Sequence, residues 1–126
     1  MLIIFLGLTP GDIFRIERII DRAWSIFIGN SNQVSMRKAK EVIRNNMQIF
    51  RIMGMFPRGF TEHEFNDYWR QIAGNRAQSA TKRQVKSFIV SYTERNFVKL
   101  LKIAEGMGLT FRSALDLINM MIGMLG

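Results

Sequence analysis

The stretch Thr81–Val98, read TKRQVKSFIVSYTERNFV, places apolar residues at helical spacing beneath a polar, basic outer face. Residues at i, i+3, i+4 and i+7 form the buried face of an amphipathic helix, and here they are Val85, Phe88, Ile89 and Tyr92. The residues on its other faces include Lys82, Arg83, Lys86 and Ser87. From Arg76 to Lys102 there are seven Lys and Arg and one acid, so this window carries six of the eight net positive charges. The sequence predicts a helix whose outer face suits a DNA groove.

Length, charge and cysteine content bound the possible classes of protein. A chain of 126 residues with 48% apolar composition is long enough for one domain with its own core. A net charge of +8 indicates an anionic partner, either a nucleic acid or an anionic membrane surface. The chain has no cysteine, which excludes disulfides, thiolate metal sites and a cysteine nucleophile.

The apolar segment Met1–Leu8, MLIIFLGL, is far shorter than the roughly 20 residues that span a bilayer. No basic leader precedes it, so we expect neither a signal peptide nor a membrane span. A buried strand or arm is one interpretation, and an arm that packs onto another subunit is the other. We therefore expect an intracellular protein, in the cytoplasm or nucleoid.

Capping signals and apolar spacing predict helices on both sides of this stretch. Thr9-Pro10-Gly11-Asp12 starts a helix that runs to about Ile28, and Gly29–Asn32 ends it. Further helices are expected over about Val34–Met53, after the capping box at Thr61, after the capping box at Thr81, and from Ser113 onward. No internal repeat is evident in the sequence.

Beyond Asn96 the pattern changes from helical to strand-like. The segments FVKLLKI (97–103) and LTFRS (109–113) flank the glycine turn EGMG (105–108), so the sequence predicts a β-hairpin.

This order of elements resembles that of winged helix-turn-helix DNA-binding domains over about Val34–Ser113. FRIMGMFPRGFTEHEF resembles the join between that family's first two helices, and VKSFIVSYTERNFV resembles its recognition helix running into the first wing strand. The resemblance implies a mainly α (α+β) fold with a small β-hairpin wing and extra N- and C-terminal helices. It divides the chain into an apolar arm and accessory helix (1–30), a DNA-binding domain (31–113) and a dimerisation helix (114–126).

The same resemblance implies which residues contact DNA. The third helix of this family enters the major groove, which assigns base contacts to Lys82, Arg83, Lys86, Gln84 and Ser87. Its wing lies near phosphates, which assigns backbone contacts to Lys99, Lys102 and Arg112. Arg76, in the turn before the helix, belongs to the same expected basic surface.

A second resemblance covers the C-terminal third of the chain. Ser87–Leu125 is similar to a ribbon-helix-helix repressor, with an alternating strand followed by helices through IAEGMGL and from Ser113. On this alternative Ser87, Ile89 and Ser91 would face the bases, which is a poor set of base readers, and the first 80 residues have no role.

Nothing in the sequence indicates catalysis, a cofactor or a metal. His63 is the single histidine and has no second His or Cys at metal-ligand spacing. Glu64 and Asp67 fit the cap and solvent face of a helix better than an acid–base pair. No phosphate loop, nucleophile triad or ligand pocket is recognisable, so we expect a protein that is not an enzyme.

The last helix is apolar around most of its circumference, which requires cover on several sides. It can pack onto its own domain or pair with a twin across a two-fold axis. We favour the homodimer, whose interface residues would be Leu115, Ile118, Met121, Ile122 and Leu125. Such a dimer spaces two recognition helices by one turn of DNA, about 34 Å.

The sequence thus predicts a dimeric, sequence-specific double-stranded DNA-binding protein that regulates transcription. The alternative is a structural protein that coats or packages DNA in a repeating array, as a viral or chromatin component, which would place it in a virion or nucleoid. An interaction module whose basic face meets an acidic protein or membrane is a third possibility.

Overall fold

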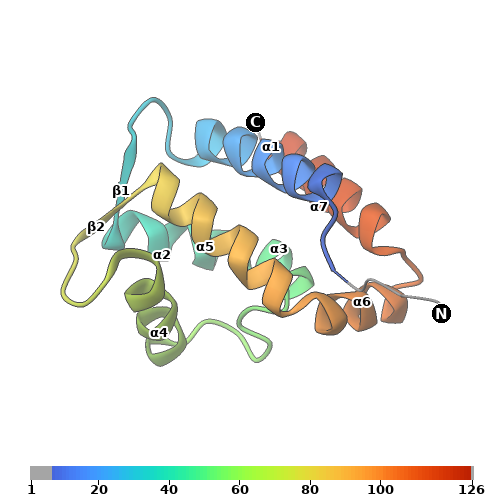
Figure 1. Ribbon diagram of the computed structural model, residues 1–126. Coiled ribbons are helices and arrows are strands. Elements are labelled where there is room, and N and C mark those ends of the chain that lie inside the picture. The colour runs from blue at the N-terminus through green and yellow to red at the C-terminus, as the bar shows by residue number, and fades with distance from the viewer. Residues whose placement is uncertain (1–6, 126) are drawn as a thin grey trace.

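The computed structural model describes residues 7–125. Within that range the chain forms seven helices and one antiparallel sheet of two short strands (Figure 1). The elements follow the order α1 (Pro10–Phe27), β1 (Gln33–Ser35), α2 (Met36–Asn45), α3 (Met47–Ile52), α4 (Glu62–Ala73), β2 (Ser79–Thr81), α5 (Lys82–Arg95), α6 (Phe97–Gly106) and α7 (Phe111–Leu125). The expectation of a mainly helical fold is confirmed.

The predicted hairpin wing is wrong. Phe97–Gly106 forms helix α6, and Phe111 begins helix α7, so neither expected wing strand exists. The glycine turn between them is a helix C-terminus, where Gly108 has φ 74 and the Leu109 amide donates to the Ala104 carbonyl at 2.8 Å. A short apolar run fits a buried helix as well as a strand, which is why periodicity alone misassigned it.

The structure contains an internal repeat, contrary to the expectation from sequence. The order helix, strand, helix, helix occurs first as α1-β1-α2-α3 and again as α4-β2-α5-α6. Helix α7 follows the second unit and corresponds to α1 and α4, the helices that begin the two units. Each of these first helices begins at a threonine whose hydroxyl accepts from the amide three residues later. Those bonds are Thr9 to Asp12 at 3.1 Å, Thr61 to Glu64 at 3.1 Å and Thr110 to Ser113 at 3.0 Å.

Equivalent tryptophans and asparagines mark the same positions in both halves. The Nε1 of Trp24 donates to the Ser31 carbonyl, and the Nε1 of Trp69 donates to the Ala77 carbonyl, each at 2.7 Å. These bonds tie each first helix to the loop that leads into its strand. Asn46 and Asn96 end α2 and α5, and each Nδ2 donates at 2.8 Å to the carbonyl four residues earlier.

The two strands pair the halves with each other. Val34 lies opposite Ala80, and both are buried, whereas the flanking pairs Gln33–Thr81 and Ser35–Ser79 are exposed. Ser35 and Thr81 also cap the helices that follow, α2 and α5. The sheet therefore places the N-termini of α2 and α5 at the same end of the molecule (Figure 1).

Helices α1 and α7 complete the domain. Helix α1, the expected accessory helix, buries Ile16, Ile20 and Trp24 and contacts α5 and α7. In α7, Leu115, Ile118 and Ile122 are buried in the core of their own chain. Of the expected apolar arm, Leu8 is buried, and residues 1–6 lie outside the described range.

Candidate nucleic-acid interface

The pairing of β1 with β2 brings two basic segments together at one end of the molecule. We call this surface the ribbon end and define it as Asn30–Lys38 and Asn75–Lys86. These segments contain six Lys and Arg and no Asp or Glu. The six bases are Arg37, Lys38, Arg76, Lys82, Arg83 and Lys86. Exposed polar side chains lie among them, from Asn30, Asn32, Gln33, Asn75, Gln78 and Ser79.

The backbone adds to the positive potential of the ribbon end. The N-terminus of an α-helix carries about half a positive elementary charge, and its free amides bind anions. Two such termini, of α2 and α5, begin directly at the paired strands. Their first amides, of Met36 and Lys82, donate to carbonyls of the opposite segment, and their third amides, of Lys38 and Gln84, donate to the capping hydroxyls. Exposed bases and two helix N-termini on one surface suit a polyanion such as the DNA backbone.

Three arginines of the ribbon end have free guanidinium groups. Arg37, Arg76 and Arg83 are exposed, and none of them forms a hydrogen bond or ion pair with another residue in the range 7–125. Lys38 forms only an exposed pair with Glu41, at 3.5 Å. Exposed pairs of this kind contribute little, so Lys38 also stays available to a partner.

Two of the expected DNA-contacting lysines instead form ion pairs with another helix of the protein. The Asp21 carboxylate of α1 lies 3.0 Å from Lys82 Nζ and 2.7 Å from Lys86 Nζ. The Lys86 hydrogen bond is the largest cause that lowers the pKa of Asp21 below its ordinary value, and the Lys82 bond adds to it. The two lysines thus join α5 to α1. They can contact a ligand only if that ligand displaces the Asp21 carboxylate.

Gln84 and Ser87 differ in their surroundings. The Oε1 of Gln84 accepts from the Thr81 amide at 2.9 Å, completing a capping box at the start of α5. Ser87 is exposed on the outer face of α5. Among the five residues expected to contact bases, Arg83 and Ser87 are therefore the ones that lie exposed without an intramolecular role.

A hollow of about 520 Å³ lies beside the start of α5. It is lined by Glu17, Asn32, Gln33, Thr81, Lys82, Arg83 and Lys86. Residues from α1, the first loop and α5 thus meet at one concave surface, which joins both repeats. Its lining side chains are all polar or charged, with three bases and one acid, so the hollow suits a phosphate better than an apolar group.

The expected wing residues lie elsewhere. Lys99 and Lys102 belong to α6 and Arg112 to the first turn of α7, at the end of the molecule opposite β1 and β2 (Figure 1). Lys99 Nζ donates to the Gly54 carbonyl at 3.1 Å, while Lys102 and Arg112 are exposed. The structure does not bring these three residues together with the ribbon end.

The expected dimer residues fall into two groups. Leu115, Ile118 and Ile122 are 8%, 6% and 2% exposed in the single chain and pack against α1 and α3. Met121 is half-buried, and Leu125 is 55% exposed. Met120 and Met124 are exposed beside Leu125, so the apolar surface that α7 offers to solvent lies near its C-terminal end.

Arg37 and Lys38 are candidate site residues that the sequence interpretation left out. A usable signal was present, because Ser35-Met36-Arg37-Lys38 and Thr81-Lys82-Arg83-Gln84 each place a capping hydroxyl before two or more basic or polar residues. The strand pairing that brings these two segments together depends on tertiary structure.

The loops of the ribbon end lack the ligands of a cation site. A helix–loop–helix segment binds calcium when its loop supplies carboxylate and carbonyl oxygens. The loops 28–35 and 74–81 contain no Asp or Glu. Across the described residues, no group of three or more His, Cys, Asp and Glu side chains is placed to hold a metal ion.

Comparisons with protein-family models, with curated proteins and with solved structures find no match to this chain. Among the helices of residues 7–125, none combines the length and the apolar character that crossing a bilayer requires.

Proposed function

We propose that the protein is a non-enzymatic double-stranded DNA-binding protein that holds the phosphate backbone at its ribbon end. The observation that carries the proposal is the pair of acid-free basic segments that β1 and β2 bring together at the starts of α2 and α5. Arg37, Arg76 and Arg83 would be the principal phosphate contacts, since their guanidinium groups are exposed and free.

The side chains at this surface favour backbone binding over base reading. Sequence is read by side chains that reach base edges, whereas phosphate contacts set affinity. Lys82 and Lys86 are bound to Asp21, and Gln84 caps its own helix. With no wing in the described residues, Arg83 is the one expected base reader with a free charged group, so we propose binding with little sequence preference.

Self-association forms part of the proposal. Met120, Met124 and Leu125 are 56%, 78% and 55% exposed and lie within six residues of each other on α7. Exposed apolar residues in a group are typical of contact surfaces between proteins. Copies joined through this surface would form a dimer or an array along DNA, as a coating protein requires. A two-fold dimer that selects one DNA sequence would instead favour a transcription regulator.

The test compares two triple variants of equal charge. Replacing Arg37, Arg76 and Arg83 with Ala lowers the net charge from +8 to +5, and replacing Arg51, Lys102 and Arg112 with Ala does the same outside the ribbon end. Binding to random-sequence duplex DNA is measured by fluorescence anisotropy between about 50 and 200 mM salt.

Each neutralised phosphate contributes about −0.9 to the slope of log K against log salt. The ribbon end has four bases available to phosphates, which are Arg37, Lys38, Arg76 and Arg83. They give the wild type a slope of about −3.6, and the ribbon-end variant, which keeps Lys38, retains about −0.9. The control variant should keep most of the wild-type slope. Equal losses in the two variants would show that net charge, rather than the ribbon end, determines binding.

A further inference from the structure

The buried apolar side chains group into three clusters, which half-buried side chains such as Ile89, Ile19 and Met53 connect into one core. The first surrounds Trp24 and Phe65, the second joins Ile16 to Leu115, and the third joins Ile49 to Ile122. A cavity of about 200 Å³ lies between them and is lined by members of all three.

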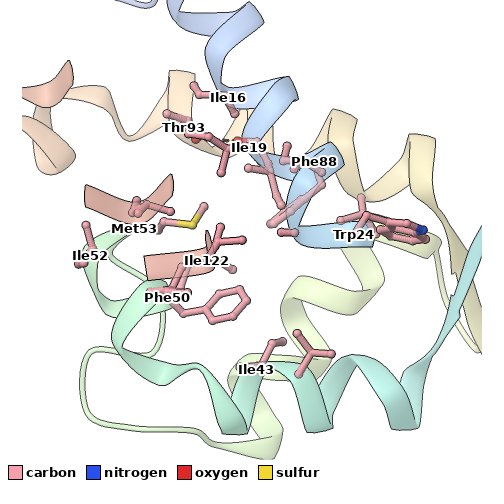
Figure 2. A pocket seen from close by; sticks show the side chains of 18 of the residues that line it. Ile16, Ile19, Trp24, Ile43, Phe50, Ile52, Met53, Phe88, Thr93 and Ile122 are labelled. Carbon is pink, nitrogen blue, oxygen red and sulfur yellow. Dashed lines mark hydrogen bonds between the residues drawn. The ribbon is translucent and has the colours of Figure 1, made fainter. Parts of the chain in front are cut away.

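Helices from both repeats and from α7 surround the cavity. Figure 2 shows side chains from α1, α2, α3, α5 and α7 around one space, among them Ile19, Ile43, Phe50, Phe88 and Ile122. These side chains are hydrocarbon throughout. Because protein interiors are normally packed as densely as organic crystals, an empty space of this size leaves many apolar atoms without contacts.

The polar groups of the lining residues either form hydrogen bonds within the protein or carry no charge. The Thr93 hydroxyl donates to the Ile89 carbonyl at 2.7 Å. The indole nitrogens of Trp24 and Trp69 donate to loop carbonyls. Burial raises the pKa of the Tyr68 hydroxyl, which keeps it uncharged. Water needs two to four polar partners to be stable in a cavity, so this cavity is a poor site for water.

We propose that this cavity binds one small, neutral, apolar molecule with the volume of a single aromatic ring or a short alkyl chain. An apolar protein cavity of about 150 Å³ stays dry and binds benzene, so a cavity of about 200 Å³ has room for such a ligand. A charged ligand is excluded, because the lining offers no ion partner for a buried charge. The inference does not depend on DNA binding.

The test uses benzene as the probe and the methionine methyl groups as reporters. Met53 and Met55 line the cavity, whereas Met120 and Met124 lie exposed on α7. In ¹³C-methyl spectra of the full chain, benzene should shift the first pair saturably, with a Kd of roughly 0.1–1 mM, and leave the second pair unchanged. Benzoate, which has the same ring with a charge, should shift neither pair.

Filling the cavity distinguishes this site from surface adsorption. Ile122→Phe adds volume inside the cavity, and Met120→Phe adds a ring on the exposed face of the same helix as a control. We expect benzene affinity to fall at least about tenfold in the first variant, because the added ring occupies the space that benzene needs. The affinity should stay unchanged in the second variant. Ile43→Phe, at a half-buried cavity position, serves the same purpose if Ile122→Phe does not fold.

Two results would overturn the inference. One is the absence of saturable shifts at Met53 and Met55 up to the solubility of benzene. The other is equal benzene affinity in the wild type and in a folded cavity-filled variant.

Discussion

Removing the Asp21 carboxylate should strengthen DNA binding while it weakens the fold. Asp21 of α1 forms ion pairs with both Lys82 and Lys86 of α5, which belong to the basic ribbon end. Asp21→Asn keeps the size of the side chain and releases both lysines. The number of bases available to phosphates then rises from four to six.

The two effects have different magnitudes. The Asp21 side chain is 47% exposed, so water screens its ion pairs, and their loss should reduce the free energy of unfolding by about 1 kcal/mol. Two additional phosphate contacts should steepen the slope of log K against log salt from about −3.6 to about −5.4. Urea denaturation followed by circular dichroism measures the first effect, and fluorescence anisotropy with random-sequence duplex measures the second.

Asp67→Asn is the matched control, because it removes one carboxylate from α4, where Asp67 pairs with Arg70 and not with the ribbon end. Both variants gain one unit of net charge, but only Asp21→Asn should steepen the salt dependence by the amount of two contacts. An Asp21→Asn protein that is folded and binds DNA more weakly than the wild type would refute the assignment of Lys82 and Lys86 to the DNA-binding surface.

Three further predictions concern stability. The Asp21 pKa is lowered in the folded state, so the stabilising effect of this carboxylate is complete above the ordinary Asp pKa of about 3.9. The effect disappears as pH falls through the lowered pKa, so the difference in Tm between wild type and Asp21→Asn should shrink as the solution is made more acidic than that pKa. Tyr92→Phe should leave the urea midpoint nearly unchanged, because the buried Tyr92 hydroxyl lies beside the Tyr68 hydroxyl but forms no well-aligned hydrogen bond among residues 7–125. A loss above about 1 kcal/mol would contradict this. Ile118→Asp should unfold the single chain, at a cost of roughly 3–5 kcal/mol by circular dichroism, whereas Met124→Asp at an exposed site should change only the association state seen in sedimentation.

Local signals in the sequence identified most of the helices correctly. Thr9, Thr61 and Thr81 were expected to cap helices, and each hydroxyl accepts the expected backbone hydrogen bond. These interactions span three residues, so the sequence around each site is sufficient to predict them.

The repeat was missed and the segment after Asn96 was misassigned because both depend on contacts between residues far apart in the sequence. The repeat has no fixed period, because α1 has 18 residues and α4 has 12, while α2 has 10 and α5 has 14. Equivalent positions such as Trp24 and Trp69 therefore do not recur at a constant spacing. The segment after Asn96 was misassigned because its apolar residues fit a strand as well as a short helix, and only packing on α5 and α7 decides between them.

Only the part of the candidate site that depends on local sequence was predicted. The basic start of α5 was evident from composition and spacing, which are local properties. The carboxylate that holds Lys82 and Lys86 comes from Asp21, 65 residues from Lys86. Arg37 reaches the same surface only through the strand pair. Neither relation can be derived without knowing how α1 and β1 pack.

The most direct test of the DNA-binding proposal is a titration of the ¹⁵N-labelled protein with a short random-sequence duplex at low salt, followed by amide NMR. We expect the largest shifts to fall on residues 30–38 and 75–86, including Arg37, Arg76 and Arg83, and to diminish as salt is raised. Shifts concentrated on α6 and the start of α7, or no shifts at low salt, would contradict the proposal.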